Sequence, residues 1–279
     1  MKVVVGVVLY NPNEKNVRWI RKLNKESLFS KLLVYDNSNE NHENCFDNQD
    51  IVYITTLKNE GLSKPYNQMI DIALQEGADF LCLLDQDSDY EIDEIAKMIR
   101  FLELKPTEIQ DSIIIAPRSY AVNSPRVTRG NYLTTVEFAI NSGSFLQLEL
   151  IKKAQLRYDE QIFLDGVDYE FGWQIIDAGY KTKIFEDSVL EQNLGYTLSE
   201  DDRFTHHSAF RYYLIAKNRR YIYRKHKGPV RGEVLAMLKN IYLCARILRH
   251  EDERREKLIA CIKGMICRRG DNEYTSYIE

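Results

Sequence analysis

Residues 81–89 read LCLLDQDSD, the most informative stretch of the chain. Its four leading apolar residues predict a buried strand, because a strand covered on both faces has no polar positions. Asp85, Asp87 and Asp89 then follow at every second position, where that strand should end. Clustered carboxylates repel one another and are costly to desolvate, so a divalent cation with phosphate ligands is one explanation. The other is an ordinary polar turn, since Asp and Ser are common turn residues.

The whole chain has the composition of a globular protein with a sizeable core: 279 residues, 44% hydrophobic and 29% charged. Its five cysteines are scattered, without a CxxC pair or zinc spacing, which indicates reduced thiols and a cytoplasmic location. Residues 1–10, MKVVVGVVLY, predict a buried first strand and not a signal peptide, because no small-residue cleavage site follows. No apolar run approaches the roughly 18 residues of a membrane-spanning helix.

Charge is distributed unevenly along the chain. Residues 211–279 carry 17 Lys and Arg against 8 Asp and Glu, whereas residues 1–210 carry 21 against 34. From about residue 209 the pattern is also helical and aromatic, so we expect two regions, 1–208 and 209–279. An acidic body suits cations and a basic tail suits anions.

The first half of the chain alternates strands and helices, and each strand ends in polar residues. Repeated strand–helix–strand units predict an α/β fold with a doubly wound sheet, which binds ligands beyond the carboxyl ends of its strands. Asn11, Asp36, Asn59 and Asp85 all follow such ends. Neither a P-loop nor a dinucleotide-binding fingerprint is present.

A second acidic group lies at residues 165–170. Asp165 and Asp168, three positions apart with Glu170 nearby, can lie on one side of a helix N-terminus. Helix capping is one explanation, and a general base that deprotonates an acceptor hydroxyl is the other. With the first group holding a metal on a diphosphate, the pair suits displacement at a sugar carbon of a nucleotide donor.

Seven segments, taken in order, resemble a known family. They are VVLYNP (7–12), VYDNS (34–38), NEGLS (59–63) with Asn67, LDQD (84–87), NSGS (141–144), FLDGVDYE (163–170), and FRYY (210–213) followed by KNR (217–219). The chain resembles bacterial family-2 glycosyltransferases, most closely rhamnosyltransferases, over residues 3–225. The resemblance implies a mixed, doubly wound sheet of the nucleotide-diphospho-sugar (A-type) glycosyltransferase fold with a C-terminal helical extension. Residues 1–208 would then form the nucleotide-sugar-binding and catalytic domain.

The resemblance also implies roles for individual residues. The donor nucleotide would contact Leu9, Tyr10, Asn11, Asp36, Asn59, Asn67, Asp85 and Gln86. Asp85 and Asp87 would hold Mg²⁺ or Mn²⁺, with Asp87 the more direct ligand. The base would be Asp165 or Asp168, and we prefer Asp165. Acceptor or accessory roles fall to Gly143, Glu170, Gln192, His206, His207 and Arg211.

Two positions depart from the family pattern. Gly166 stands where many relatives have an Asp as the base, and Gln192 stands where relatives have a His that completes the metal shell. His206 or His207 could substitute for that His, could contact the acceptor, or could be plain loop residues.

The expected function is inverting transfer of a sugar, with dTDP-rhamnose the candidate donor, to a surface polysaccharide or lipid-linked glycan. A metal-dependent nucleotidyltransferase is an alternative, but the Gly-rich basic loop it needs is absent. A non-catalytic nucleotide- or glycan-binding protein is another, because Gly166 and Gln192 depart from the pattern. The basic, Tyr-interleaved residues 219–231 suit the inner face of the cell membrane, a homodimer contact or a solvated helix face. The acidic body argues against nucleic acid as a partner.

Overall fold

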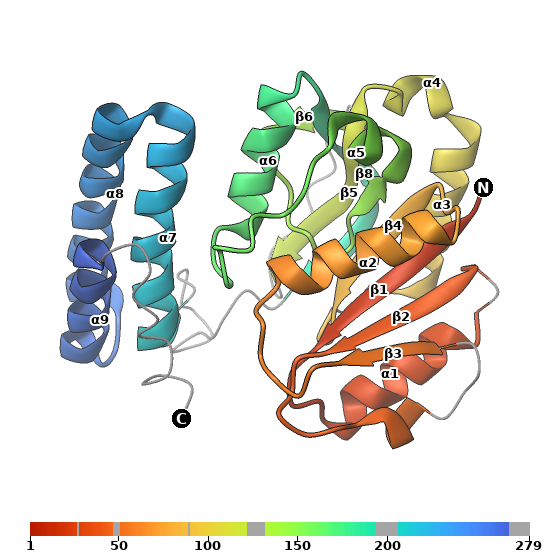
Figure 1. The fold of residues 1–279 in the computed structure, drawn as a ribbon, viewed down its shortest axis with the longest axis horizontal. Helices are drawn as coiled ribbons and strands as arrows, with labels where there is room; N and C mark the ends of the chain where they lie inside the picture. Colours follow the sequence, from red (N-terminus) through yellow and green to blue (C-terminus); the bar gives the residue numbers. More distant parts are fainter. Residues whose placement is uncertain (27, 47–50, 89, 122–131, 193–205, 268–279) are drawn as a thin grey trace. The chain divides into compact units, whose positions relative to one another are not determined.

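The computed structural model describes residues 1–26, 28–46, 51–88, 90–121, 132–192 and 206–267. The described residues form an eight-stranded sheet in the order β3-β2-β1-β4-β7-β5-β8-β6 (Figure 1). The strands are β1 (Val3–Leu9), β2 (Lys31–Asp36), β3 (Ile51–Thr55), β4 (Phe80–Asp85), β5 (Ser112–Ala121), β6 (Leu133–Val136), β7 (Phe145–Gln147) and β8 (Lys181–Gln192).

Helices alternate with these strands and then take over at the C-terminal end. They are α1 (Glu14–Asn24), α2 (Ser63–Gln75), α3 (Ile92–Leu104), α4 (Pro106–Ile109), α5 (Leu148–Ala154), α6 (Val167–Asp177), α7 (Ala209–Lys227), α8 (Pro229–His250) and α9 (Arg254–Ile266), with a 3₁₀ turn, η1, at Glu43–Phe46. None of the helices in the described part of the chain is long and apolar enough to cross a bilayer.

The sheet is mixed, and its chain order reverses at β1. Strands β1, β2, β3 and β4 are all parallel, but β2 and β3 lie on one side of β1 and β4 lies on the other. Strand β7 is antiparallel to both β4 and β5. In a doubly wound sheet, ligands bind in the crevice beyond the carboxyl ends of the strands where the order reverses. Here that place is beyond β1 and β4.

Helices cover both faces of the parallel strands, because alternate residues of a strand point to opposite faces. Val3, Val5, Val7 and Leu9 of β1 belong to a buried cluster that also contains residues of α1 and α3. The opposite face meets α2, where a side chain in place of Gly6 would collide with Met69. The apolar run of β1 is therefore buried on both sides, as its sequence predicts.

The chain divides into two compact units: residues Met1–Gln161 with Val167–Asn193, and residues Ile162–Gly166 with Leu194–Glu279. We call them the sheet unit and the helical unit. The predicted boundary between residues 208 and 209 falls inside the helical unit, and the short segment Ile162–Gly166 also groups with the helices.

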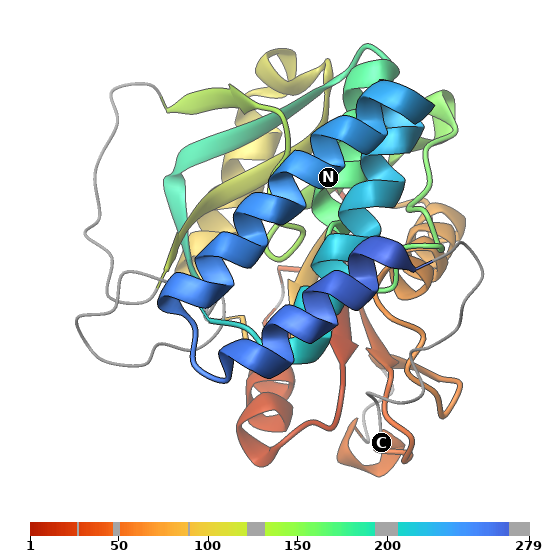
Figure 2. The same cartoon turned by 90° about the vertical axis from the view of Figure 1, so that its left-hand side faces the viewer.

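Close contacts of α7 with its two neighbours hold the helical unit together. Helices α8 and α9 lie side by side (Figure 2), and both pack on α7. A side chain at Gly232 of α8 or Gly264 of α9 would collide with backbone carbonyls of α7, at Tyr223 and Tyr213 respectively. Glycine at these two positions therefore permits the close approach of the helix backbones. The core between the helices contains Tyr212, Ala216, Leu243, Ile247 and Cys261.

Candidate active site

Polar residues predicted from the sequence meet at the carboxyl edge of the parallel strands. Strand pairing places Leu9 beside Asp36 and Val8 beside Asp85, so the ends of β1, β2 and β4 are level with one another. The side chain of Gln86 bridges two of these ends, because its Oε1 accepts from the Tyr10 N–H at 2.8 Å and its Nε2 donates to the Tyr10 carbonyl at 3.0 Å. Hydrogen bonds therefore hold together the polar residues at the point where the strand order reverses.

Asp36 is a fully buried carboxylate at the end of β2. Its oxygens accept from the Ser38 N–H at 2.8 Å and the Tyr53 hydroxyl at 2.6 Å, and His42 Nδ1 lies 2.8 Å away. Burial alone would raise the pKa of Asp36, but the hydrogen bonds from Ser38, Tyr53 and His42 outweigh it and lower the pKa. Asp36 therefore stays charged and fixes the loop that follows β2.

The loops after β1, β2 and β3 are tied to one another. Asn11 has a left-handed backbone (φ 45°), and its N–H donates to Ser38 Oγ at 2.8 Å. Asn37 donates to the Gly61 carbonyl at 2.6 Å, and Asn59 Oδ1 accepts from the Gly61 N–H at 3.1 Å. Leu9 is completely buried, whereas the Tyr10 side chain is 40% exposed at the same edge. Tyr10 is therefore the accessible aromatic ring of this edge, on a backbone held by Gln86.

Asp85 and Asp87, the predicted metal ligands, differ in their surroundings. Asp85 is half-buried, and its N–H donates to Ser88 Oγ at 3.0 Å and to Ser142 Oγ at 3.2 Å. Asp87 is exposed, and no described residue forms a hydrogen bond or ion pair with its side chain. Two hard oxygen donors at one strand end, one of them facing solvent, suit Mg²⁺ or Mn²⁺.

Asp168 and Asp85 are brought to one hydroxyl group. Burial raises the pKa of Tyr66 well above its usual value, the negative charges of Asp85 and Asp168 raise it further, and the Tyr66 hydroxyl hydrogen-bonds to Asp85. Tyr66 comes from α2, Asp85 from β4 and Asp168 from the first turn of α6. The two acidic groups that the sequence singles out therefore meet around Tyr66 within the sheet unit.

A chain of buried hydrogen bonds supports Asp168. The Asn141 N–H donates to Asp168 Oδ1 at 3.2 Å, and Asn141 Oδ1 accepts from the Tyr158 hydroxyl at 2.8 Å. The backbone of Tyr158 pairs with both polar atoms of the Asn67 side chain, each at 2.9 Å. Asn67, which the sequence analysis placed at the donor nucleotide, therefore orients Tyr158 in the sheet unit.

Residues 141–144 form the bend that joins these groups. The Gly143 N–H donates to the Leu83 carbonyl at 2.7 Å, and the Ser144 carbonyl accepts from the Leu83 N–H at 3.0 Å. Gly143 has φ 81°, and a Cβ there would lie 2.8 Å from Pro117. Only glycine permits both the backbone conformation and the close approach, so Gly143 shapes the site through its backbone.

Asp165, in the helical unit, forms an ion pair. Arg211 of α7 donates through Nη2 to Asp165 Oδ1 at 2.6 Å and through Nε at 3.1 Å, and Asn218 donates to the Asp165 carbonyl at 2.7 Å. Gly166 next to it has φ 100°, and a Cβ there would meet Ile222 at 2.8 Å. A two-pronged arginine contact stabilises the charged carboxylate. Asp165 and Gly166 thus attach their segment to α7.

The remaining predicted residues are placed as follows. Glu170 is buried and accepts from Gln174 Nε2 at 2.6 Å. The side chain of Gln192 lies outside the described residues. His207 has a pKa lowered to about 4, first because burial disfavours its charged form and then because Arg211 repels it.

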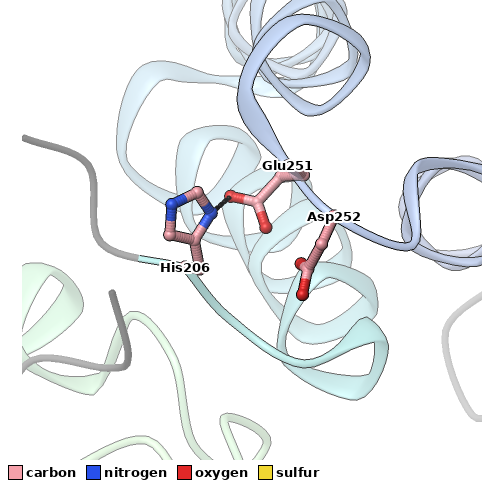
Figure 3. Close-up of side chains that lie close together, drawn as sticks. All are labelled: His206, Glu251 and Asp252. Carbon is pink, nitrogen blue, oxygen red and sulfur yellow. Dashed lines mark ion pairs between the residues drawn. The ribbon is translucent and has the colours of Figure 1, made fainter. Parts of the chain in front are cut away.

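His206 belongs to a buried charged cluster of the helical unit (Figure 3). His206, Glu251 and Asp252 offer ligand atoms close enough together for a metal ion. His206 Nδ1 lies 3.0 Å from Glu251 Oε1, but the completely buried Lys257 is 2.8 Å from Glu251 Oε2 and also contacts Asp252. The ammonium group of Lys257 already supplies the positive charge that these two carboxylates require. The cluster therefore has the character of a structural ion-pair network.

Sequence reasoning assigned no role to several residues of the site: Ser38, His42, Tyr53, Tyr66, Ser88, and Asn141 with its partner Tyr158. It also missed Lys257 in the ion-pair network of the helical unit. Ser38 and Asn141 lie within quoted motifs and Ser88 directly follows one, so the motifs carried a usable signal for these three residues. The tyrosines carry no such signal, because their partners are distant in sequence.

Known proteins resemble this chain in sequence and in fold. No protein-family model matches the chain. The dTDP-rhamnosyl transferase RfbF of Shigella flexneri is 22% identical over 289 residues, covering 97% of this chain and 97% of that protein. The resemblance to rhamnosyltransferases inferred from the motifs is confirmed by this relative.

Solved structures share the fold. S. aureus TarS 1-349 in complex with UDP has a TM-score of 0.56 and 15% identity, covering 95% of this chain and 80% of that one. GalNAc-T7 with UDP, GalNAc and Mn²⁺ has a TM-score of 0.58 and 12% identity, covering 100% of this chain and 58% of that one. The predicted α/β, A-type glycosyltransferase fold with a C-terminal helical extension is confirmed.

Proposed function

We propose that this protein is a glycosyltransferase that moves a sugar from a nucleoside-diphosphate donor to a hydroxyl group, at the edge beyond β1 and β4. The observation that carries the proposal is that two adjacent residues of one bend, Ser142 and Asn141, hydrogen-bond to Asp85 and Asp168 respectively, while both carboxylates raise the pKa of Tyr66. A strand-end carboxylate beside a diphosphate and a second carboxylate beside an acceptor are the two charges that this reaction needs.

The donor is dTDP-rhamnose. This assignment draws on the similarity to RfbF, whose name specifies dTDP-rhamnosyl transfer, and on fold neighbours solved with UDP. Tyr10, exposed on a backbone held by Gln86, offers its ring to the nucleobase. The loops that carry Asn11, Ser38 and Asn59 are tied together and would surround the nucleoside.

A divalent cation would be held by Asp85 and Asp87. Bound there, Mg²⁺ or Mn²⁺ supplies positive charge to the diphosphate as it leaves. Asp87 faces solvent, while the Tyr66 hydroxyl and the backbone contacts to Ser88 and Ser142 orient Asp85. The carboxylates of Glu251 and Asp252 do not compete for this role, because Lys257 occupies them.

Asp168 is the general base, and Asp165 has a positioning role. Asp168 belongs to the same unit as Asp85 and is oriented by the Asn141 N–H. Asp168 takes the proton of the acceptor hydroxyl as the hydroxyl oxygen bonds to the sugar carbon and the bond from that carbon to the diphosphate breaks. Attack from the side opposite the leaving group inverts the configuration at the carbon. Asp165 anchors the segment Ile162–Gly166, which precedes α6, through its ion pair with Arg211.

The acceptor is a hydroxyl of a surface polysaccharide or lipid-linked glycan. Glu170, one turn after the start of α6, is buried and bonded to Gln174, so it supports the helix that presents Asp168.

A donor panel tests the proposal. The purified protein is incubated with nucleotide sugars, Mn²⁺ and oligosaccharides that can accept rhamnose, and the release of nucleoside diphosphate is measured. The melting temperature is measured separately with each nucleoside diphosphate. We expect release with dTDP-rhamnose, and a stabilisation of about 2.7 kcal/mol at a dTDP concentration one hundred times its Kd. Stabilisation by dTDP without release from any donor would favour the non-catalytic binding protein. Release that persists unchanged in Asp87→Ala would contradict the metal assignment.

A further inference from the structure

Helix α8 has two apolar faces, and only one of them is used inside the helical unit. Its buried residues, Gly232, Ala236, Asn240, Leu243 and Ile247, recur at helical spacing. Seven large apolar side chains of the same helix are at least half exposed: Val230, Val234, Met237, Leu238, Ile241, Tyr242 and Leu248. At about 100° per residue, these seven lie on the side of the helix opposite the buried set. We call them the exposed stripe.

The exposed stripe is too continuous to be ordinary surface. It runs from Val230 to Leu248, a length of about 27 Å at 1.5 Å per residue. Val230 is 77% exposed and Tyr242 is 72% exposed. Helix α9, which lies beside α8, adds Ile259, Ile262 and Ile266, also exposed and also at helical spacing. Single exposed apolar residues are normal, but seven of them along one side of a helix indicate an interaction site.

The charges around the stripe are positive. Arg231, Lys239 and Arg249 are exposed along α8. The single acid of α8, Glu233, is occupied by Arg220 at 2.6 Å and Arg224 at 3.0 Å. Lys225 and Lys227 at the end of α7 are exposed as well, next to the start of the stripe. The exposed acids of this region, Glu253 and Glu256, lie at the opposite end, between α8 and α9.

We propose that the exposed stripe of α8, with its neighbours on α9, lies in the surface of an anionic lipid bilayer. An apolar helix face flanked by Lys and Arg is the pattern of helices that lie in a membrane interface. Long basic side chains such as Arg231 and Arg249, which border the stripe at 100° per residue, can place their charges at lipid phosphates while the stripe enters the acyl region. Tyr242 combines an apolar ring with a polar hydroxyl, as residues at membrane interfaces do.

A second copy of the chain fits this surface less well. In a symmetric dimer the same patch faces itself, so the basic residues that accompany the stripe in one copy would lie opposite the basic residues of the other copy. Like charges placed opposite one another disfavour the contact. An anionic bilayer satisfies both the apolar stripe and its basic border.

The structure also relocates the membrane contact that the sequence suggested. Among the basic residues 219–231, for which a membrane surface was one of three alternatives, Arg219 donates to Asn240 Oδ1 at 2.8 Å, and Arg220 and Arg224 form ion pairs with Glu233. Ile222 is buried. These residues join α7 to α8, and the surface available to lipid lies on α8 and α9.

Co-sedimentation of the full chain with vesicles tests the proposal. The vesicles contain phosphatidylcholine alone, or phosphatidylcholine and phosphatidylglycerol in equal parts. We expect binding to the mixed vesicles, a much lower affinity for the neutral ones, and weakening by salt. The triple variant Met237→Ser, Ile241→Ser, Leu248→Ser and the triple variant Arg231→Glu, Lys239→Glu, Arg249→Glu should each reduce the partition coefficient by at least about tenfold.

Matched controls come from the sheet unit. Leu57→Ser with Leu104→Ser removes exposed apolar side chains, and Lys22→Glu with Lys25→Glu reverses exposed charges; neither pair should change the partition coefficient. Circular dichroism establishes that each variant is folded. Absence of binding to the mixed vesicles, or equal binding by the serine triple variant, would overturn the proposal. A dimer in solution that the serine variant converts to a monomer would also overturn it, because the stripe would then join two copies.

Discussion

Asp85 at the end of β4 and Asp168 at the start of α6 act on the same hydroxyl group, that of Tyr66. The two carboxylates come from segments far apart in sequence, yet α2 and the bend at residues 141–144 bring them into one polar cluster. We therefore assign the two carboxylates different roles: Asp85 acts on the donor diphosphate, and Asp168 acts on the acceptor hydroxyl.

The two candidate bases can be separated by substitution. Asp168→Asn keeps the shape of the side chain and removes the base, so kcat should fall by about 10²- to 10⁴-fold with little change in melting temperature. Asp165→Asn breaks the ion pair with Arg211, so the melting temperature should fall while a larger share of kcat remains. Initial rates and thermal melts of both variants are the measurements. A greater loss of kcat in folded Asp165→Asn would reverse the assignment.

Metal dependence should map to the strand end and not to the histidine cluster. Asp87→Asn removes an exposed oxygen ligand, so the Mn²⁺ concentration for half-maximal activity should rise by at least about tenfold. Glu251→Gln should leave that concentration unchanged, although it lowers stability, because Lys257 loses its buried partner. The measurement is a titration of the activity of both variants with Mn²⁺. A rise in the half-maximal concentration for Glu251→Gln but not for Asp87→Asn would place the metal in the helical unit.

Lys257 should be a major contributor to the stability of the helical unit. The Lys257 side chain is fully buried and pairs with Glu251 and Asp252, so Lys257→Met leaves the buried Glu251 without its ammonium partner. The free energy of unfolding should fall by about 3–5 kcal/mol. Lys263→Met, on an exposed position of the same helix, should change it by no more than about 0.5 kcal/mol.

A double variant sharpens this test. Lys257→Met combined with Glu251→Met replaces the buried charges by apolar side chains, and it should lose less stability than Lys257→Met alone. Denaturant unfolding of the three variants provides the comparison. An equal loss for Lys257→Met and Lys263→Met would show that the ion pair contributes little.

His207 should make the protein sensitive to acid. Burial, then the charges of Arg211 and Arg246, lower its pKa from 6.5 to about 4, while Asp165 and Glu251 oppose the shift. Between these two pH values the unfolded chain binds a proton that folded His207 does not, so stability falls as the pH drops from 6.5 towards 4. His207→Gln and His207→Phe should both flatten the dependence of melting temperature on pH in that window. A slope identical to that of the unsubstituted protein would contradict this origin.

The sequence predicts the parts of the site that depend on strand ends. Asp36 and Asp85 are predicted at one edge because parallel strands begin and end together, and apolar runs mark where each strand stops. Tyr66 and Tyr158 could not be predicted, because their partners depend on how α2 packs against the bend at residues 141–144. The partners of Asp165 and Lys257 are hidden for the same reason, since ion pairs between helices have no local pattern.

The exposed stripe of α8 illustrates a different limit. Its apolar spacing is visible in the sequence, but so is the spacing of the buried set on the same helix. Only the packing of α8 on α7 decides which of the two faces is covered. Sequence periodicity therefore indicated a helix without indicating its free face.

The most direct test of the central claim follows the reaction itself by nuclear magnetic resonance. The protein is mixed with dTDP-rhamnose, Mn²⁺ and an oligosaccharide acceptor, and the anomeric signals of donor and product are recorded over time. We predict equimolar appearance of dTDP and of a rhamnoside whose anomeric configuration is opposite to that of the donor, and product formation about 10²- to 10⁴-fold slower with Asp168→Asn. Unchanged donor across all acceptors, or a product that retains the donor configuration, would contradict the proposal.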